Sequence, residues 1–164
     1  MRFRNPTILL LAVFAVVVAG CASTSAIGHA EQGLKVAVGA VDPLVQTDYA
    51  QAAQCRENNV PTTPDCSKLE KMFPGTHELA NKIRAAFPPT ERAAYSGVAA
   101  ARDAQKVLDA INVKAGATDA EKQSAAQAFQ AALVDMATKV AIAIAYGSQA
   151  QAVILPWIAS GGGK

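Results

Sequence analysis

Residues 118–143 read TDAEKQSAAQAFQAALVDMATKVAIA and predict the longest helix of the chain. Thr118 and Glu121 have the spacing of a capping box, in which a Thr at the N-cap and a Glu three residues later satisfy each other's backbone N–H groups. Apolar residues then recur at steps of three and four, which places them on one helical face: Phe129, Leu133, Met136, Val140 and Ala143. We expect this helix to cover residues 119–147.

A second helix is predicted directly before it, over residues 89–112. Its inward face follows the same spacing: Tyr95, Val98, Ala101, Gln105, Leu108 and either Ile111 or Asn112. Only a short loop around Gly116 separates the two helices, so they should pack antiparallel. The chain is also rich in Ala, the best helix former, and contains only 5% aromatic residues. The sequence therefore predicts an all-α fold, a small antiparallel helical bundle.

Shorter helices are predicted earlier in the chain, and we expect Pro residues to end or kink them. One covers residues 43–57, with Asp42 as N-cap and Pro43 at the first helical position. The other begins after Thr76 as N-cap and ends at residues 88–89, a Pro-Pro pair. The inward candidates are Leu44, Val45, Tyr49, Ala52 and Ala53 in the first helix and Leu79, Ile83 and Phe87 in the second. Residues 33–41 fit a strand or a helix, and we favour the helix because no partner strand is near.

The first residues have the layout of a secretory signal peptide. Arg2 and Arg4 precede an apolar run over residues 8–18, and the small residues Ala19 and Gly20 precede Cys21. The run is too short to cross a bilayer comfortably, because a spanning helix needs roughly 20 apolar residues.

The four residues Val18-Ala19-Gly20-Cys21 resemble the lipobox of bacterial lipoproteins. The resemblance covers only the first 21 residues. It implies that residues 1–20 are removed and that Cys21 carries the lipid, with fatty acids such as palmitate on its thiol-linked glycerol and on its new amino terminus. Ala22 in place of Asp implies sorting to the inner leaflet of the outer membrane, facing the periplasm. An uncleaved N-terminal anchor and a plain signal peptide cut nearby are the alternatives.

Removal of residues 1–20 would also change the charge of the chain. The 15 basic residues include Arg2 and Arg4, so 13 basic residues would remain against 13 acidic ones. A neutral domain argues against non-specific nucleic-acid binding. We divide the remainder into a flexible tether over residues 21–32, one helical domain over 33–158 and a flexible tail over 159–164, which ends in Gly-Gly-Gly-Lys.

Two further cysteines bracket a Pro-rich loop, Cys55 before it and Cys66 after it. With Cys21 joined to lipid, the remaining number is even, and in an oxidising compartment such a pair forms a disulfide. Metal binding by Cys55, Cys66 and His77 is an alternative, but their spacing matches no zinc pattern. Unpaired or redox-active thiols are another alternative. We expect a disulfide-closed loop and no metal site.

The stretch over residues 140–158 is apolar on almost every side and includes Tyr146 and Trp157. Ser148, Gln149 and Gln151 lie in its middle, and polar groups there are costly inside a bilayer. We therefore favour a buried core helix over a membrane span, and we name Tyr146 and Trp157 as possible contacts to a partner or a membrane. Pro156 is expected to end this helix.

No residue pattern in the sequence points to catalysis or to a cofactor. The two His residues, His29 and His77, fall at positions expected to be exposed, and no nucleophile motif accompanies them. We expect a non-catalytic domain that binds a protein or another envelope component. A carrier of a small apolar ligand or lipid between the helices is the first alternative, and a small envelope enzyme is the second.

Overall fold

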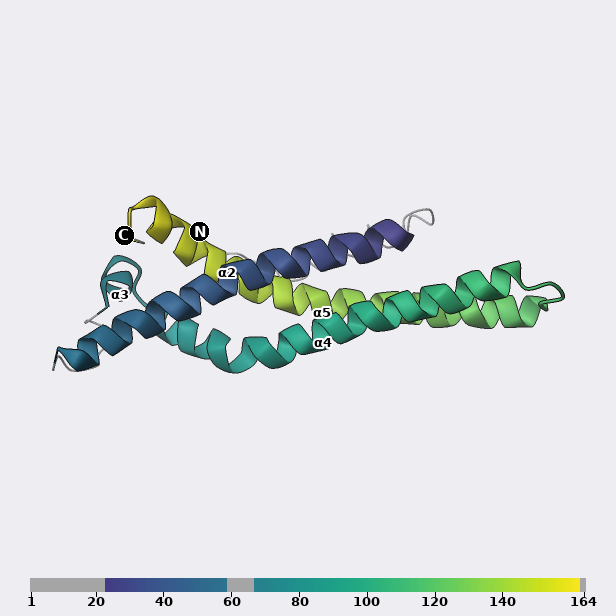
Figure 1. The fold of residues 1–164 in the computed structure, drawn as a ribbon, viewed down its shortest axis with the longest axis horizontal. Helices are drawn as coiled ribbons and strands as arrows, with labels where there is room; N and C mark the ends of the chain where they lie inside the picture. Colours follow the sequence, from purple (N-terminus) through teal and green to yellow (C-terminus); the bar gives the residue numbers. More distant parts are fainter. Residues whose placement is uncertain (1–22, 59–66, 163–164) are drawn as a thin grey trace. The chain divides into compact units, whose positions relative to one another are not determined.

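The computed structural model of the chain describes residues 23–58 and 67–162. All regular secondary structure in these ranges is helical (Figure 1): α2 (Ser23–Glu57), α3 (Lys68–Met72), α4 (Thr76–Val113) and α5 (Asp119–Ala159). The prediction of an all-α helical bundle is confirmed. The predicted signal peptide, Cys21 and Cys66 lie outside the described residues.

Contacts group the chain into two compact units. Unit 1 contains α2 up to Leu34, α4 from Glu91 and α5 up to Ile142. Unit 2 contains α2 from Lys35, α3, α4 up to Thr90 and α5 from Ala143. Each of the three long helices therefore contributes to both units, and the single domain proposed over residues 33–158 stays a prediction.

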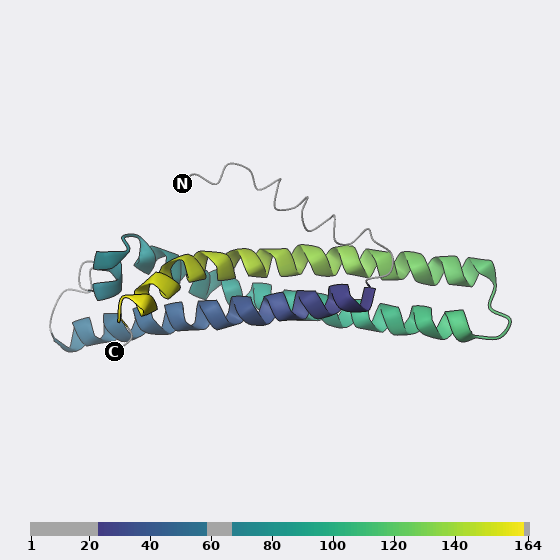
Figure 2. The ribbon, with the colours of Figure 1, turned by 90° about the horizontal axis from the view of Figure 1, so that it is seen from above.

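In unit 1, α4 and α5 run antiparallel on either side of a short turn (Figure 2). Gly116 allows this turn, because its φ of 78° lies in the left-handed region that favours glycine. The two helices approach closely at Gly97, where an added Cβ would lie 3.1 Å from the Cα of Met136. The predicted face of α5 is buried in the structure: Phe129, Leu133, Met136, Val140 and Ala143. The predicted antiparallel pair is thus confirmed.

The capping box that begins α5 is also confirmed. The backbone N–H of Thr118 donates to the Glu121 carboxylate at 2.7 Å, and the backbone N–H of Glu121 donates to the Thr118 hydroxyl at 3.2 Å. The hydrogen bond from the Thr118 backbone, with further bonds from Lys114 and the Thr118 hydroxyl, holds the pKa of Glu121 below its ordinary value.

In unit 2, α2 and α5 are in even closer contact. A Cβ on Gly147 would lie only 2.5 Å from the Cα of Ala37, so glycine is the residue that fits there. Small residues at this contact let the two backbones approach. The large buried apolar residues of unit 2 include Leu44, Leu69, Ile83, Phe87, Ile154 and Trp157.

The buried residues of α5 follow alternating steps of three and four along the helix. After Ala125 and Phe129, which are also buried, they are Leu133, Met136, Val140, Ala143, Gly147, Ala150, Ile154 and Trp157. This is the heptad spacing of helices that pack side by side over many turns. The other side of α5 is left largely exposed.

The predictions that a helix begins at Pro43 and that helices end at Pro88-Pro89 and at Pro156 are wrong. α2 continues through Pro43, α4 through Pro88 and Pro89, and α5 through Pro156. A Pro removes the hydrogen bond to the carbonyl four residues earlier. In this chain those carbonyls belong to exposed residues, so water can bind them: Gly39, Arg84, Ala85 and Ala152. The packed sides of the helices keep their hydrogen bonds.

The structure also differs from the flexible tether expected over residues 21–32. Residues 23–32 belong to α2, and Ile27 is buried. Glu31 in this part of α2 forms an ion pair with Arg102 of α4, with 2.5 Å between Oε2 and Nη2. Residues 33–41 are also helical, as the sequence favoured.

Candidate functional site

A connected cluster of polar side chains joins α2 to α4 in unit 2. Asp48 of α2 is buried, with only 4% of the residue exposed. Both of its carboxylate oxygens lie near Nδ1 of His77 on α4, at 3.0 and 3.1 Å. The other ring nitrogen of His77, Nε2, lies 3.0 Å from the side-chain nitrogen of Asn81.

A fourth side chain determines the direction of these hydrogen bonds. Arg84 donates to the side-chain oxygen of Asn81 at 2.7 Å, so the Asn81 nitrogen must be the group that faces His77. That nitrogen donates to Nε2, and the proton of the neutral ring is then on Nδ1, which donates to Asp48. In this arrangement neither ring nitrogen is open to a substrate, and the cluster connects two helices.

The turn before α4 is capped by Glu70 rather than by Thr76, the residue that the sequence suggests. The Glu70 carboxylate accepts hydrogen bonds from the backbone N–H groups of Gly75 and His77, at 2.6 and 2.8 Å. The Thr76 hydroxyl instead donates to the carbonyl of Phe73. A carboxylate at a helix N-terminus is favourable because the free N–H groups there carry partial positive charge. This cap also orients the first turn of α4, from which His77 projects.

A second contact holds the start of α3 against α2. The side-chain oxygen of Gln51 accepts from the Ser67 hydroxyl at 2.5 Å and from the backbone N–H of Leu69 at 3.0 Å. Cys55, one turn after Gln51, is buried. Because Cys66 is outside the described residues, the pairing of Cys55 with Cys66 stays a prediction.

The two aromatic residues named as possible contacts lie in unit 2 and are largely covered. Trp157 is 3% exposed, and Gly162 lies against its indole ring. Tyr146 is half-buried and makes an edge-to-face contact with Phe87, with 6.3 Å between the ring centres. Their contact with a partner or a membrane stays a prediction.

Two other tyrosines are exposed, although the sequence places them on inward faces. Tyr49 of α2 is 57% exposed and Tyr95 of α4 is 40% exposed. Their neighbours Asp48 and Ala94 are buried instead. The prediction is therefore wrong for these two tyrosines, whereas Leu44, Val98 and Ala101 of the same predicted faces are buried.

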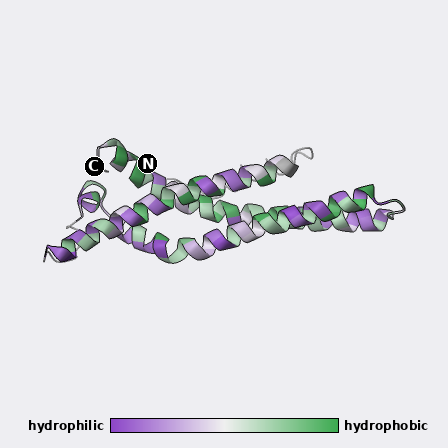
Figure 3. Cartoon of the chain, in the orientation of Figure 1, coloured by the Kyte–Doolittle hydropathy of each residue, from purple (hydrophilic) through white to green (hydrophobic). Residues whose placement is uncertain are grey.

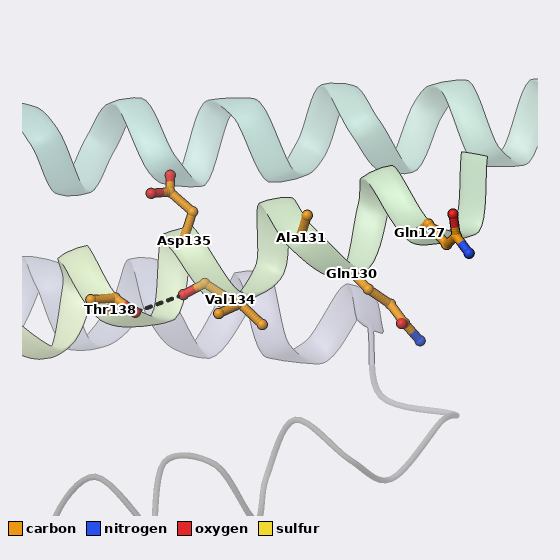
Figure 4. Close-up of a pocket in the computed structure, with 6 residues that line it drawn as sticks. All are labelled: Gln127, Gln130, Ala131, Val134, Asp135 and Thr138. Atoms are coloured by element: carbon orange, nitrogen blue, oxygen red, sulfur yellow. Dashed lines mark hydrogen bonds between the residues drawn. The ribbon is translucent and has the colours of Figure 1, made fainter. Parts of the chain in front are cut away.

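A shallow hollow of about 640 Å³ lies on α5 in unit 1 (Figure 4). Its lining residues lie on successive turns of this one helix: Gln127, Gln130, Ala131, Val134, Asp135 and Thr138. A surface built from one helix does not enclose a small apolar ligand, which usually needs a concave site. The carrier alternative and the enzyme alternative both stay predictions.

One described helix, α5, is long and apolar enough to cross a membrane by length and composition. An 18-residue window within it has a mean hydropathy of 1.5, and 28% of that window is buried. Figure 3 shows hydrophobic residues on the C-terminal part of α5. Among the described residues, no group of three or more His, Cys, Asp or Glu side chains is placed to hold a metal ion.

No family model matches the chain, and neither the curated proteins nor the solved structures contain a match to it.

Proposed function

We propose that the chain is a lipoprotein of the bacterial outer membrane, anchored through acylated Cys21, whose helical bundle binds an envelope protein in the periplasm. The observation that carries the proposal is the motif Val18-Ala19-Gly20-Cys21 at the end of a basic and then apolar leader. Three acyl chains form a firm anchor, because each buried CH₂ contributes about 0.8 kcal/mol and one chain alone binds only marginally.

The start of α2 adds a geometric consequence to this proposal. The described helix begins at Ser23, two positions after Cys21. The ion pair of Glu31 with Arg102 and the burial of Ile27 attach this first part of α2 to α4 and α5 in unit 1. The bundle would therefore start directly at the membrane.

Two exposed aromatic residues support a binding role. Tyr49 and Tyr95 present large side chains to solvent on α2 and α4. Tyr is enriched at protein–protein interfaces because it buries a large area and keeps a hydroxyl for hydrogen bonding. His77, the residue that would be needed for proton transfer, has both ring nitrogens engaged.

The proposal includes a disulfide between Cys55 and Cys66. The contact of Gln51 with Ser67 supports it, because it holds the residue after Cys66 beside the turn of α2 that precedes Cys55. A protease digest of the secreted protein without reductant should give the two cysteine peptides as one linked species. Separate peptides under those conditions would contradict the pairing.

An in-cell crosslinking experiment tests the binding role. The tagged full chain is crosslinked in a Gram-negative host, purified and analysed by mass spectrometry beside Cys21→Ser, which lacks the lipid attachment site. We expect one dominant envelope protein, captured by the wild type and lost in Cys21→Ser. Tyr49→Ala and Tyr95→Ala should weaken its capture, while Val107→Ala, an equally exposed change on α4, should not. Equal profiles in all variants would contradict the proposal.

A further inference from the structure

The outer side of α5 near its C-terminal end exposes large apolar residues. The inner side in unit 2 carries Gly147, Ala150, Ile154 and Trp157, which are buried. Next to this inner side, Leu155 is 57% exposed and Ile158 is 54% exposed. These two side chains are three residues apart, so they are neighbours on the helix surface. Ala152 and Ala159 are exposed on the same side.

This side of the helix has no charged residue near it in the sequence. No Lys, Arg, Asp or Glu occurs between Lys139 and Lys164. A helix whose outer side faces water normally carries charged and polar residues there. Burial within the chain does not explain the composition either, because only 28% of the most apolar window of α5 is buried, whereas a helix at the core of a soluble domain is mostly covered.

The chemistry of this outer side fits hydrocarbon better than a protein partner. A protein interface carries about one hydrogen bond per 100–200 Å² and a polar rim, whereas every side chain from Ala152 to Ala159 is apolar. The close packing of Gly147 on Ala37 keeps the inner side against α2, so the helix would lie along a bilayer and would not cross it. Half-buried Gln151 and exposed Ser148 lie one and two turns before Leu155 on the same side, and the apolar patch ends there.

We propose that the outer side of α5 around Leu155 and Ile158 lies on the lipid bilayer and holds unit 2 against the membrane. The proposal rests on the lipid anchor at Cys21, because an interfacial helix without Lys or Arg gains nothing from anionic lipids and binds weakly by itself. The anchor keeps the patch close to the bilayer at a high local concentration, and the patch adds a second, purely hydrophobic contact.

A Trp placed on the patch gives a direct measurement. The only Trp of the chain, Trp157, is buried on the inner side, so Trp157→Phe/Ala159→Trp moves the indole to an exposed position one turn after Leu155 and serves as the reference protein. The full-length reference protein is expressed with its leader, purified in detergent and reconstituted into phosphatidylethanolamine–phosphatidylglycerol vesicles with brominated acyl chains. Flotation of the vesicles measures anchoring. Quenching of the indole introduced by Ala159→Trp acts only at short range and measures contact of the patch with lipid.

The variant Leu155→Gln/Ile158→Gln removes the apolar patch at two exposed positions. When it is made in the reference protein, we expect it to float like the reference but to show quenching reduced at least about twofold, because the apolar area that drives contact is lost. Val36→Gln/Val107→Gln in the same reference, at positions with exposures of 53% and 56%, is the matched control and should be quenched like the reference. Circular dichroism checks that the helix content is equal in all three proteins.

The outcomes separate this proposal from the anchor itself. Flotation without quenching, or equal quenching in the three proteins, would overturn the membrane contact and leave the anchor intact. Loss of flotation would contradict the anchor at Cys21. In that case, quenching measured at high lipid concentration still tests whether the patch contacts lipid. Quenching that is abolished by Leu155→Gln/Ile158→Gln supports this contact, and the absence of quenching overturns it.

Discussion

Asp48 is a buried carboxylate whose described hydrogen bonds all go to His77. Its replacement by Ala leaves Nδ1 of His77 without an acceptor in a half-buried position. An unsatisfied group of this kind costs about 1–3 kcal/mol of unfolding free energy. We therefore expect Asp48→Ala to lower the stability measured by urea unfolding by about that amount.

Asp42→Ala is the matched control, because Asp42 is an exposed aspartate in the same helix. A surface change of this kind usually stays within about 0.5 kcal/mol. Equal losses in the two variants would mean that the contact with His77 contributes little to stability.

The sequence could not reveal this cluster, and the reason lies in Pro43. We expected a new helix to begin there, which placed Tyr49 on the inner face. In the structure α2 continues through Pro43, so the helical phase set by Leu34, Val41 and Leu44 carries on to Asp48. The partner of Asp48 is 29 positions away in sequence, a distance at which no local pattern predicts contact.

Glu121 gives a pH-dependent test of the capping box. Its pKa is lowered chiefly by the backbone hydrogen bond from Thr118 and then by Lys114. The box therefore favours the folded state fully above the ordinary pKa of a glutamate, and this contribution is lost as the pH falls through the lowered value. Carboxyl NMR titration of Lys114→Ala should show a Glu121 pKa that rises only partway, because the N–H of Thr118 still donates. An unchanged pKa in the variant would exclude Lys114 as a cause.

At the scale of the helices, the close contact of α2 with α5 depends on Gly147. An added methyl group would overlap Ala37, at 2.5 Å from its Cα and 2.6 Å from its Cβ. Forcing extra atoms into a packed contact typically costs about 1–3 kcal/mol, more than the roughly 1 kcal/mol that Ala gains over Gly in a helix. We expect Gly147→Ala to lower the melting temperature.

Gly28→Ala is the control with the opposite expected sign. Gly28 also lies in a helix, but an added Cβ would meet nothing within 4 Å. This change should raise stability by about 0.4–1 kcal/mol, because Ala restricts the unfolded chain and favours the helix. A melting temperature that rises in both variants would show that the two helices separate easily at this point.

The helices themselves were predictable where one amphipathic face dominates. The face from Phe129 to Ala143, the capping box and the turn at Gly116 are all local signals, and the structure confirms them. Helix ends were not predictable from the four internal Pro residues. Each Pro leaves one backbone carbonyl without its helical hydrogen bond, and the cost of this loss depends on whether the carbonyl is exposed to water. In this chain the carbonyls concerned face water, which a linear sequence does not show.

At the scale of the whole molecule, an acylated Cys21 would bring the start of the bundle to the bilayer. With residues 1–20 removed, the chain would carry 13 basic and 13 acidic residues, so long-range attraction to anionic lipid would contribute little. The choice of membrane would then depend on the residues beside the lipid. In enterobacterial lipoproteins, which the motif resembles, an Asp after the acylated Cys implies retention in the inner membrane.

Ala22 is therefore the position that tests the proposed location. In an enterobacterial host we expect Ala22→Asp to move the protein from the outer to the inner membrane, measured by sucrose-gradient separation of the two membranes. Ala22→Ser, which adds a polar group without charge, should stay in the outer membrane. Melting temperatures of both variants control for a loss of folding. If Ala22→Asp stayed in the outer membrane while Cys21→Ser left the membranes, the anchor would stand and the sorting proposal would fall.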